Sequence, residues 1–388
     1  MEWKEYQIQD VCRLINGRAY SNDEMLEHGK YKIVRVGNLS GGNSTWFYSD
    51  LELPADKYCH NGDLLFAWAC TFGPHIWKED NTIFHYHIWK IVEDKDVVDR
   101  RFFYYYLKFA TGGFLGALNG SVMVHITKSS MEKMIIRIPK KLEDQRRIAS
   151  ILSSLDRKIE LNNKINADLE EMAQAIFKNW FVDFEPFKDG KFVDSELGMI
   201  PEGWKVVVFD NILKVTTTKT GKEGIPEYSV TNTGIHPRDE KFTKNLSKSS
   251  AKNKLIRKGN LVFGMSREIL NWGIMKEEVG GVSSAYNVYI VDEKIVSTTY
   301  LECFIAQRMD YFADLIKPAS REGQGVDKAL LMKKIICIPP SEVLDVFLEK
   351  YNSIMHLTEI RNQENSRLSL LRDTLLPRLM SGELEVPE

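Results

Sequence analysis

The chain of 388 residues is 43% hydrophobic, 11% aromatic and 27% charged, a composition that excludes an intrinsically disordered protein, and its length suits two domains with connectors. The net charge of −2 is unevenly distributed, because residues 204–335 carry +6 and residues 1–137 carry −1, as expected if only parts of the chain face nucleic acid. No apolar run approaches the roughly 18 residues that span a membrane, and the N-terminus lacks the layout of a signal peptide, so the sequence predicts a cytoplasmic protein.

The sequence repeats itself with a period near 200 residues. Trp3 corresponds to Trp204, the Gly-Asp-Leu-Leu-Phe segment 62–66 to 259–263, and the segment 135–139, which ends in Ile-Pro, to 335–339. This ordered series at nearly constant offset indicates that one structural unit was duplicated. Ile-Pro-Glu-Gly precedes Trp204 and the chain ends Val-Pro-Glu, so we expect a pseudo-twofold arrangement with neighbouring termini.

Taken in chain order, the pattern predicts five segments. Residues 1–139 form the first repeat, 140–182 a long helix, 183–203 a connector, 204–339 the second repeat and 340–388 a second long helix. Short β-branched and aromatic runs predict strands, and longer 3–4 periodic runs predict helices. The predicted strands cover 31–36, 64–68, 84–92, 260–265 and 285–291, and the predicted helices within the repeats cover 101–110 and 298–315. The predicted fold class is α/β (α+β): two similar mixed α/β domains separated by a long two-helix antiparallel coiled coil.

The two long helices, expected over 143–180 and from an N-cap at Ser341 to Pro377, carry apolar residues at heptad spacing around polar middles. Each helix could pack on its own domain, but polar middles favour helices that pair with each other or with a partner protein. A helix of 38 residues spans about 57 Å, more than one turn of DNA. The residues assigned to pairing or partner docking are Leu152, Leu155, Ile159, Asn162, Asn166, Leu169, Ile176, Trp180, Tyr351, Ile354, Leu368, Leu371 and Leu375.

Three strings of residues resemble the specificity subunits of Type I restriction–modification systems. Segments 177–187 (FKNWFVDFEPF) and 195–204 (SELGMIPEGW) are similar to that family's central conserved region, and 370–384 (LLRDTLLPRLMSGEL) to its C-terminal one. The resemblance covers essentially the whole chain. It implies two target recognition domains that each read half of a bipartite DNA site, and helices that dock two methyltransferase subunits, with a motor-nuclease able to join.

The second repeat departs from the family's better-kept pattern at two places. Asn260 replaces the aspartate of Gly-Asp, and residues 341–345 lack the usual Glu-Gln. These departures bear on the detailed symmetry of the two repeats more than on function.

The sequence predicts no catalytic site and no metal site in this chain. The only Pro-Pro, at 339–340, lacks the polar and aromatic neighbours of an adenine methyltransferase loop, and no glycine-rich phosphate loop is present. A nuclease built on Asp63, Glu79 and Lys78 lacks the usual acidic-x-Lys spacing. His85 and His87 alternate on a predicted strand near His75, which suits ordinary hydrogen bonding better than a metal. S-adenosylmethionine, ATP and magnesium are therefore expected in partner subunits.

The five cysteines, odd in number and without a Cys-x-x-Cys pair, favour a reducing compartment over a zinc site.

The predicted DNA contacts lie in one segment of each repeat. The basic segment 241–258 contains no acidic residue and suits phosphate contacts, although a solvated surface has the same composition. An arginine just after it has the donors to bind guanine, and polar loop residues in the first repeat can reach base edges. The candidates are Asn38, Ser40, Asn43, Thr45, Thr71 and His75 in the first repeat, and Lys244, Lys248, Lys252, Lys254, Arg257, Lys258 and Arg267 in the second.

Three alternatives stay open from sequence alone. In place of a specificity subunit, the chain could be a stand-alone two-headed DNA-binding protein, a coiled-coil scaffold, or a nuclease. Stoichiometric partner chains, DNA binding and metal-dependent cleavage by the purified chain discriminate among them.

Overall fold

A computed structural model describes residues 1–39, 44–69, 72–117, 126–238, 249–266, 268–316 and 326–387. The chain divides into two compact units, which we call unit 1 (Met1–Lys164 with Arg361–Glu388) and unit 2 (Ile165–Ile360). Each long helix therefore contributes one part to each unit. The domain boundaries given above, which treat the helices as separate segments, stay a prediction.

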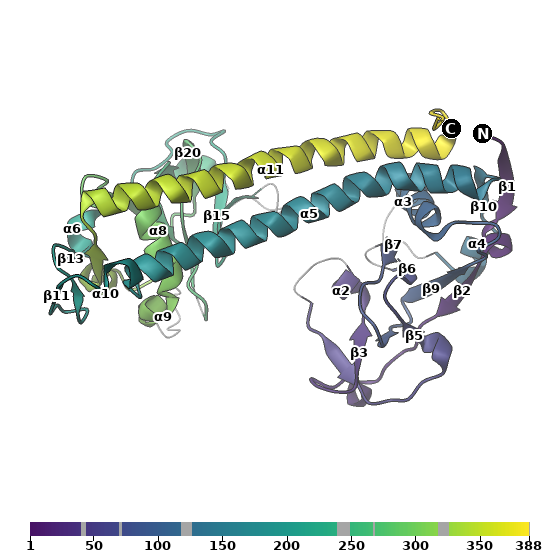
Figure 1. The fold of residues 1–388 in the computed structure, drawn as a ribbon, viewed down its shortest axis with the longest axis horizontal. Coiled ribbons are helices and arrows are strands. Elements are labelled where there is room, and N and C mark those ends of the chain that lie inside the picture. Colours follow the sequence, from purple (N-terminus) through teal and green to yellow (C-terminus); the bar gives the residue numbers. More distant parts are fainter. Residues whose placement is uncertain are drawn as a thin grey trace. The chain divides into compact units, whose positions relative to one another are not determined.

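Unit 1 is built on two four-stranded sheets (Figure 1). The first sheet has the order β2-β9-β6-β7, with all pairs antiparallel, and the second has the order β4-β3-β8-β5. A separate pair joins β1 to β10. The strands are β1 (Trp3–Gln7), β2 (Cys12–Asn16), β3 (Tyr31–Val34), β4 (Phe47–Ser49), β5 (Tyr58–Cys59), β6 (Leu64–Ala67), β7 (Gly73–Ile76), β8 (Thr82–Phe84), β9 (Ile88–Glu93) and β10 (Ile135–Pro139). The short helices are α1 (Ile8–Val11), η1 (Asn22–Glu24), α2 (Val36–Leu39), η2 (Ala55–Lys57), α3 (Arg100–Ala117) and α4 (Lys128–Glu132).

Unit 2 repeats this plan with different residues. Its main sheet has the order β14-β21-β18-β19, the counterpart of β2-β9-β6-β7, and β13 pairs with β22 as β1 pairs with β10. The strands are β11 (Phe192–Val193), β12 (Ile200–Pro201), β13 (Lys205–Val208), β14 (Leu213–Thr216), β15 (Tyr228–Thr231), β16 (Gly234–Pro237), β17 (Lys254–Arg257), β18 (Leu261–Phe263), β19 (Trp272–Ile274), β20 (Val279–Val282), β21 (Asn287–Val291) and β22 (Ile335–Ile338). The helices are η3 (Glu185–Phe187), α6 (Phe209–Ile212), η4 (Ser250–Lys252), α8 (Thr298–Gln307), α9 (Met309–Phe312), η5 (Ala313–Leu315) and α10 (Lys328–Lys333). The matching strand orders confirm two similar mixed α/β domains.

The Gly-Asp-Leu-Leu-Phe element is a turn followed by a doubly buried strand. Gly62 has φ of +90° and Gly259 has φ of +81°, a conformation that glycine adopts without strain. The His60 N–H donates to the Asp63 carboxylate at 3.0 Å, and in unit 2 the Arg257 N–H donates to the amide oxygen of Asn260 at 2.9 Å. The asparagine that departs from the family pattern therefore makes the same hydrogen bond.

The strand after this turn, β6, packs with its two faces in two different hydrophobic cores. Leu64 and Phe66 lie in the core that includes α3, whereas Leu65 and Ala67 lie in a second core with β3 and β8. Because successive side chains point to opposite faces of a strand, burial on both faces explains a continuous apolar run without alternation.

Two long helices, α5 (Leu142–Phe181) and α11 (Ser341–Ser381), pair antiparallel within each unit (Figure 1). In unit 1, Leu152 shares a core with Leu379, and further along α5 Asn162 donates to Asn365 at 2.9 Å. In unit 2, Phe181 packs against Phe347, with ring centroids 4.9 Å apart. Positions therefore rise along α5 as they fall along α11, which confirms the predicted antiparallel pair.

The predicted end of the second helix at Pro377 is wrong, because α11 continues to Ser381. Proline removes one hydrogen bond inside a helix, but the turn after it carries Leu379 and Met380, which are buried in the core of unit 1. Gly382, with φ of +80°, then ends the helix. Packing thus overrides a local stop signal. The helix also includes Ser341, which we had expected as its N-cap.

Two other predicted elements are interrupted. The run 84–92 contains a turn at residues 85–87 between β8 and β9, so His85 and His87 do not alternate along a strand. The Ile88 N–H closes this turn on the His85 carbonyl at 2.9 Å. The run 298–315 is divided into α8, α9 and η5, and Arg308, whose φ of −123° and ψ of 37° are not helical, separates α8 from α9.

Within unit 1, a buried glutamine on α5 binds the segment before α3 and the end of β10. The Gln145 side chain is fully buried, accepts the Asp99 N–H at 2.8 Å, and donates to the carbonyls of Val97 and Pro139 at 3.0 and 2.8 Å. Both the oxygen and the nitrogen of its amide are thereby hydrogen-bonded at a site that excludes water. The residue 200 positions later, Asp345, is exposed, so unit 2 holds its helices by other contacts.

Candidate nucleic-acid interface

Two of the predicted first-repeat contacts, Asn38 and Thr45, follow β3, and Asn38 lies in α2. The amide oxygen of Asn38 accepts the Arg35 N–H at 3.0 Å, and its nitrogen donates to the Ser44 carbonyl at 3.3 Å. These bonds commit the Asn38 side chain to holding the loop. The exposed Thr45 and Asn38 help to line a cavity of about 320 Å³ with Arg35, Gly37, Ser44 and Phe47. Ser40 and Asn43 lie outside the described residues.

His75, the remaining described candidate of unit 1, lies on β7 opposite Leu65. Its side chain is half-buried, and burial, followed by the charge of Lys108, lowers the pKa of the imidazole below its usual value. The neutral ring is therefore favoured near pH 7, when it can accept as well as donate a hydrogen bond. Thr71 lies outside the described residues.

The basic segment of unit 2 is divided by the pleat of β17. Lys254 is half-buried and donates to the Tyr286 carbonyl, and burial followed by the charge of Lys328 lowers the pKa of its ammonium group. Lys252 and Arg257 are exposed, and Lys258 pairs with Glu278 at 3.4 Å. Lys244, Lys248 and Arg267 lie outside the described residues. Among the described members of this segment, Lys252 and Arg257 are thus exposed and in no ion pair, and their DNA contact stays a prediction.

Arginine side chains and aromatic rings form a mixed surface in unit 1. The Arg35 guanidinium lies 5.0 Å from the Phe47 ring centroid, and that of Arg18 lies 5.1 Å from Tyr20. Arg18 also makes a bidentate pair with Glu24 at 2.9 and 2.6 Å. The alternation of Arg or Lys with aromatic residues in segments 18–20 and 30–35 is the sequence signal that would have identified this surface.

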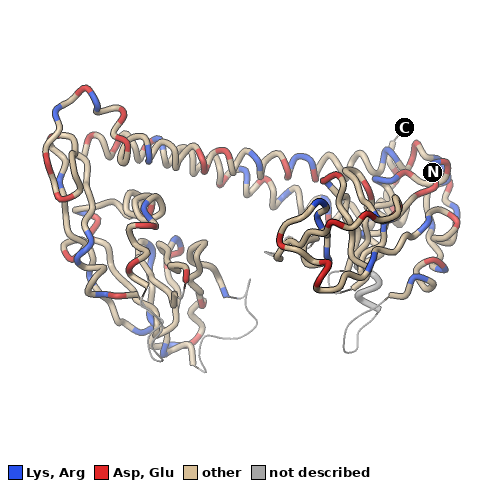
Figure 2. The backbone as a smooth tube through the Cα atoms, turned by 90° about the horizontal axis from the view of Figure 1, so that it is seen from below, with Lys and Arg blue, Asp and Glu red and all other residues tan. Residues whose placement is uncertain are grey.

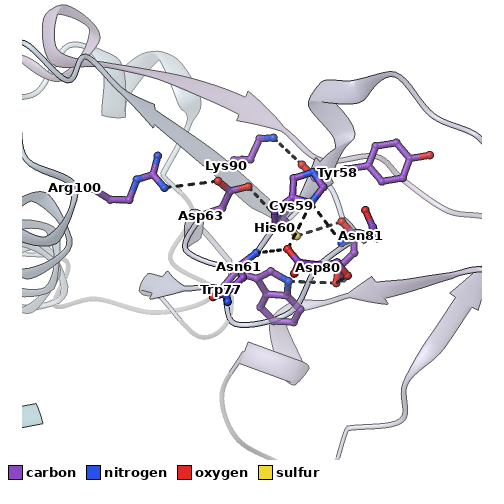
Figure 3. A network of polar contacts seen from close by, with 11 residues as sticks. Tyr58, Cys59, His60, Asn61, Asp63, Trp77, Asp80, Asn81, Lys90 and Arg100 are labelled. Carbon is purple, nitrogen blue, oxygen red and sulfur yellow. Dashed lines mark hydrogen bonds and ion pairs between the residues drawn. The ribbon is translucent and has the colours of Figure 1, made fainter. Parts of the chain in front are cut away.

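The acidic residues near the Gly-Asp turn have structural roles (Figure 3). Asp63 lies between the His60 N–H and Arg100, whose nearest nitrogen is 3.8 Å from it. Glu79 pairs with Lys32 at 2.9 Å, and Lys78 pairs with Glu160. The three groups considered for a nuclease thus each bind a different partner, and over the described ranges no three His, Cys, Asp or Glu side chains gather as metal ligands would.

The predicted pairing residues differ in burial. Leu152, Asn162, Asn166 and Ile354 are buried, whereas Leu371 is 47% exposed. The others are half-buried: Leu155, Ile159, Leu169, Ile176, Trp180, Tyr351, Leu368 and Leu375. Asn162 donates to Glu364 and Asn365 at 2.8 and 2.9 Å, and Asn365 donates to Asn163 at 2.8 Å, so the polar middle is a hydrogen-bonded layer.

The long helices also present apolar side chains to solvent. In unit 1, Leu161 on α5 is 51% exposed and Leu370 on α11 is 70% exposed. In unit 2, a groove of about 380 Å³ is lined by Ile176, Val346, Glu349, Lys350, Ser353 and Ile354. Lys and Arg are interspersed with Asp and Glu along both helices (Figure 2), so these faces lack the single-sign charge of a surface that follows a phosphate backbone.

Comparisons with known proteins identify the family. A family model described as the Type I restriction modification DNA specificity domain matches residues 1–171. The MjaIX Type I restriction enzyme specificity subunit of Methanocaldococcus jannaschii is 30% identical over 316 residues, which cover 76% of this chain and 71% of that one. This chain belongs to the Type I specificity subunits.

Other members match this specificity subunit over its whole length. The HindI specificity subunit of Haemophilus influenzae is 24% identical over 471 aligned positions, covering 99% of this chain and all of the relative. The solved S subunit of the Type I restriction–modification system of M. genitalium matches the fold with a TM-score of 0.56 at 13% identity, covering 97% of this chain and 96% of that one. None of the helices within the described ranges has the length and apolar character needed to cross a membrane.

The strings that carried the resemblance have clear structural roles in this specificity subunit. Phe181, Phe184 and Phe187 surround Trp204, with ring centroids 5.8, 5.2 and 5.4 Å from it. The C-terminal string contains Gly382, where a Cβ atom would lie 2.9 Å from the ring of Trp3, the repeat counterpart of Trp204. The N-terminal ammonium group pairs with Glu385 at 3.3 Å, so the predicted proximity of the termini is confirmed within unit 1.

Proposed function

We propose that this specificity subunit binds a bipartite site in double-stranded DNA, with each unit reading one half. The observation that carries the proposal is one scaffold present twice, with the same strand order but different loop residues, and two continuous helices that belong to both units. Two copies of a reading domain with different surfaces suit two different half-sites.

We further propose that α5 and α11 dock two methyltransferase subunits, and that a motor-nuclease subunit can join them. The exposed leucines at positions 161, 370 and 371 and the groove beside Val346 support this role, because apolar surface on a soluble protein marks interaction sites. The chain itself would then be non-catalytic, with S-adenosylmethionine, ATP and magnesium bound by the partners.

Replacing Leu370 and Leu371 by aspartate is expected to reduce recovery of co-expressed methyltransferase subunits at least tenfold. Two charges would then lie in an interface that excludes water. Leu370 is 70% and Leu371 47% exposed in the isolated chain, so its stability should stay within about 0.5 kcal/mol of the parent. The control replaces both leucines by methionine, which keeps the apolar surface. Equal recovery of partners with the aspartate and methionine variants would remove this face from the docking surface.

Replacing Lys252 and Arg257 by alanine should weaken binding to all DNA sequences alike. Each lost phosphate contact lowers the slope of log affinity against log salt by about 0.9, so the double variant should lose close to 2 from the slope. Lys276→Ala is the matched control, since Lys276 is already paired with Glu302. A salt slope equal to that of the control would exclude these two residues from the DNA interface.

Co-expression with candidate methyltransferase subunits tests the proposed function. We expect a stable complex of this chain with two copies of the methyltransferase that binds a bipartite duplex more tightly than random DNA. A purified chain that forms no such complex but binds DNA specifically would be a stand-alone DNA-binding protein. A chain that ignores DNA with every candidate partner would refute the proposal.

A further inference from the structure

The turn at residues 85–87 of unit 1 presents an aromatic side chain on a rigid backbone. The turn joins β8 to β9 and is closed by the Ile88 N–H on the His85 carbonyl at 2.9 Å. The Tyr86 N–H donates to the Arg18 carbonyl at 2.9 Å, and the Trp68 N–H donates to the His87 carbonyl at 3.1 Å. The Trp68 indole also donates to the Tyr86 carbonyl at 2.9 Å. These bonds on both sides of Tyr86 fix where its side chain emerges.

The ring of Tyr86 is held between neighbours and still reaches solvent. Its centroid lies 4.4 Å from that of His85, 3.9 Å from His87 and 6.3 Å from the ring of Trp68. The Tyr86 residue is nevertheless 40% exposed. An exposed aromatic ring whose position is already fixed loses little conformational entropy on binding, which is why such rings are frequent in recognition surfaces.

Two arginines lie beside this turn. The His85 N–H donates to the Val34 carbonyl at 3.0 Å, which places Arg35 directly beside the turn, and the backbone of Arg18 pairs with that of His85 in an isolated β-bridge. The guanidinium of Arg18 is itself paired with Glu24 at 2.6 Å. The burial of His85, with smaller effects of His87 and Arg35, lowers the pKa of its imidazole to about 4. An aromatic ring next to arginines fits a ligand with flat apolar groups on an anionic backbone, which is DNA.

The equivalent turn of unit 2 is closed by the same kind of hydrogen bond and has different side chains. It lies in the segment 283–286 between β20 and β21, and the Tyr286 N–H closes it on the Ser283 carbonyl at 3.0 Å. The sequence there is Ser-Ser-Ala, where unit 1 has His-Tyr-His. Two equivalent positions with unlike side chains are what two domains need in order to discriminate different bases.

We propose that Tyr86, oriented by His85 and His87, contacts bases in the half-site read by unit 1, and that residues 85–87 and 283–285 are equivalent specificity-determining turns. This inference rests on the proposed function, because it assigns a base-contacting residue to the same DNA interface. The contact would be made by the ring edge and face, as apolar groups contact the thymine methyl group or a base step.

The test uses the full methyltransferase complex and a set of duplexes in which each base pair of the bipartite site is changed in turn. Tyr86→Ser should lose roughly tenfold discrimination at one or two base pairs of a single half-site. Ser284→Tyr should change preference only in the other half-site, and Ser284→Ala, the control, should change neither. Tyr86→Phe should retain most of the wild-type preference, because the proposed contact uses the ring.

The outcomes separate the two proposals. If Tyr86→Ser keeps wild-type discrimination at every base pair, this inference is overturned and the proposed function stays intact. The same holds if Tyr86→Ser loses discrimination equally in both half-sites while the thermal midpoint of the variant is unchanged. If Tyr86→Ser fails to fold, the reciprocal Ser284→Tyr variant gives the answer by itself. A wild-type complex without bipartite preference would overturn the proposed function and this inference together.

Discussion

Replacing Arg100 by threonine is expected to lower the free energy of unfolding of unit 1 by roughly 3 kcal/mol. Two nitrogens of the Arg100 guanidinium lie 2.8 and 2.7 Å from Glu93 Oε1, and a third donates to the Gly62 carbonyl at 2.8 Å. The Glu93 side chain is only 3% exposed, and its Oε2 has no hydrogen-bond partner within the described ranges. Without Arg100 this carboxylate would be buried and uncompensated.

Adding Glu93→Val to Arg100→Thr should recover most of the lost stability. Unit 2 shows that the scaffold accepts this pair, because Val291 ends β21 where Glu93 ends β9, and Thr298 begins α8 where Arg100 begins α3. Replacing a buried ion pair by apolar residues is often neutral, whereas breaking it is destabilising. Urea unfolding followed by tryptophan fluorescence measures both variants. A double variant as unstable as the single one would show that the ion pair is not the source of the effect.

The second large effect is expected for Phe177→Ala, which should destabilise unit 2 by about 3–5 kcal/mol. Phe177 on α5 is fully buried, and its ring centroid lies 5.0, 5.3 and 5.7 Å from those of Phe181, Tyr300 and Phe347. The side chain thus joins α5, α8 and α11 in one core. Truncation would leave a cavity among rigid rings that cannot move in to fill it.

Met172→Ala is the matched control for Phe177→Ala, because Met172 is on the same helix and 50% exposed. We expect its stability to stay within about 0.5 kcal/mol of the parent. In the complex, Phe177→Ala should also weaken recognition of one half-site more than the other, because it loosens α5 from unit 2. Calorimetric unfolding of the two variants checks the first claim, and equal melting of both would contradict it.

The sequence was sufficient for the features that repeat or extend over many residues. The duplication was visible because corresponding segments stay in order at a nearly constant offset, and the strand orders of the two units confirm it. The long helices were visible because heptad spacing persists through 40 and 41 residues. A pattern that extends over many residues still predicts the element when single positions depart from it.

The errors occurred where a tertiary contact outweighs a local signal. Pro377 stays inside α11 because Leu379 and Met380 are buried beyond it. The run 84–92 has the composition of one strand, yet the closing bond between Ile88 and His85 divides it. Neither contact can be derived from propensity alone.

Individual site residues were the hardest to predict, because a polar side chain on a loop has two possible roles. The amide of Asn38 has the donors and acceptors to read a base, but in the structure it bonds the backbone at residues 35 and 44. The charge of Lys254 suits a phosphate contact, but the pleat of β17 turns the side chain toward the Tyr286 carbonyl. The Tyr86 turn lies within the run 84–92, whose composition predicts one strand, so the sequence pattern gives no sign of a DNA contact there.

Mapping methylated adenines across the genome of cells that express this chain with its methyltransferase partners tests the central claim most directly. Two reading units predict one methylated motif made of two specified segments separated by a stretch of fixed length in which any base is accepted. A single uninterrupted motif, or methylation that is unchanged when this chain is omitted, would contradict the account.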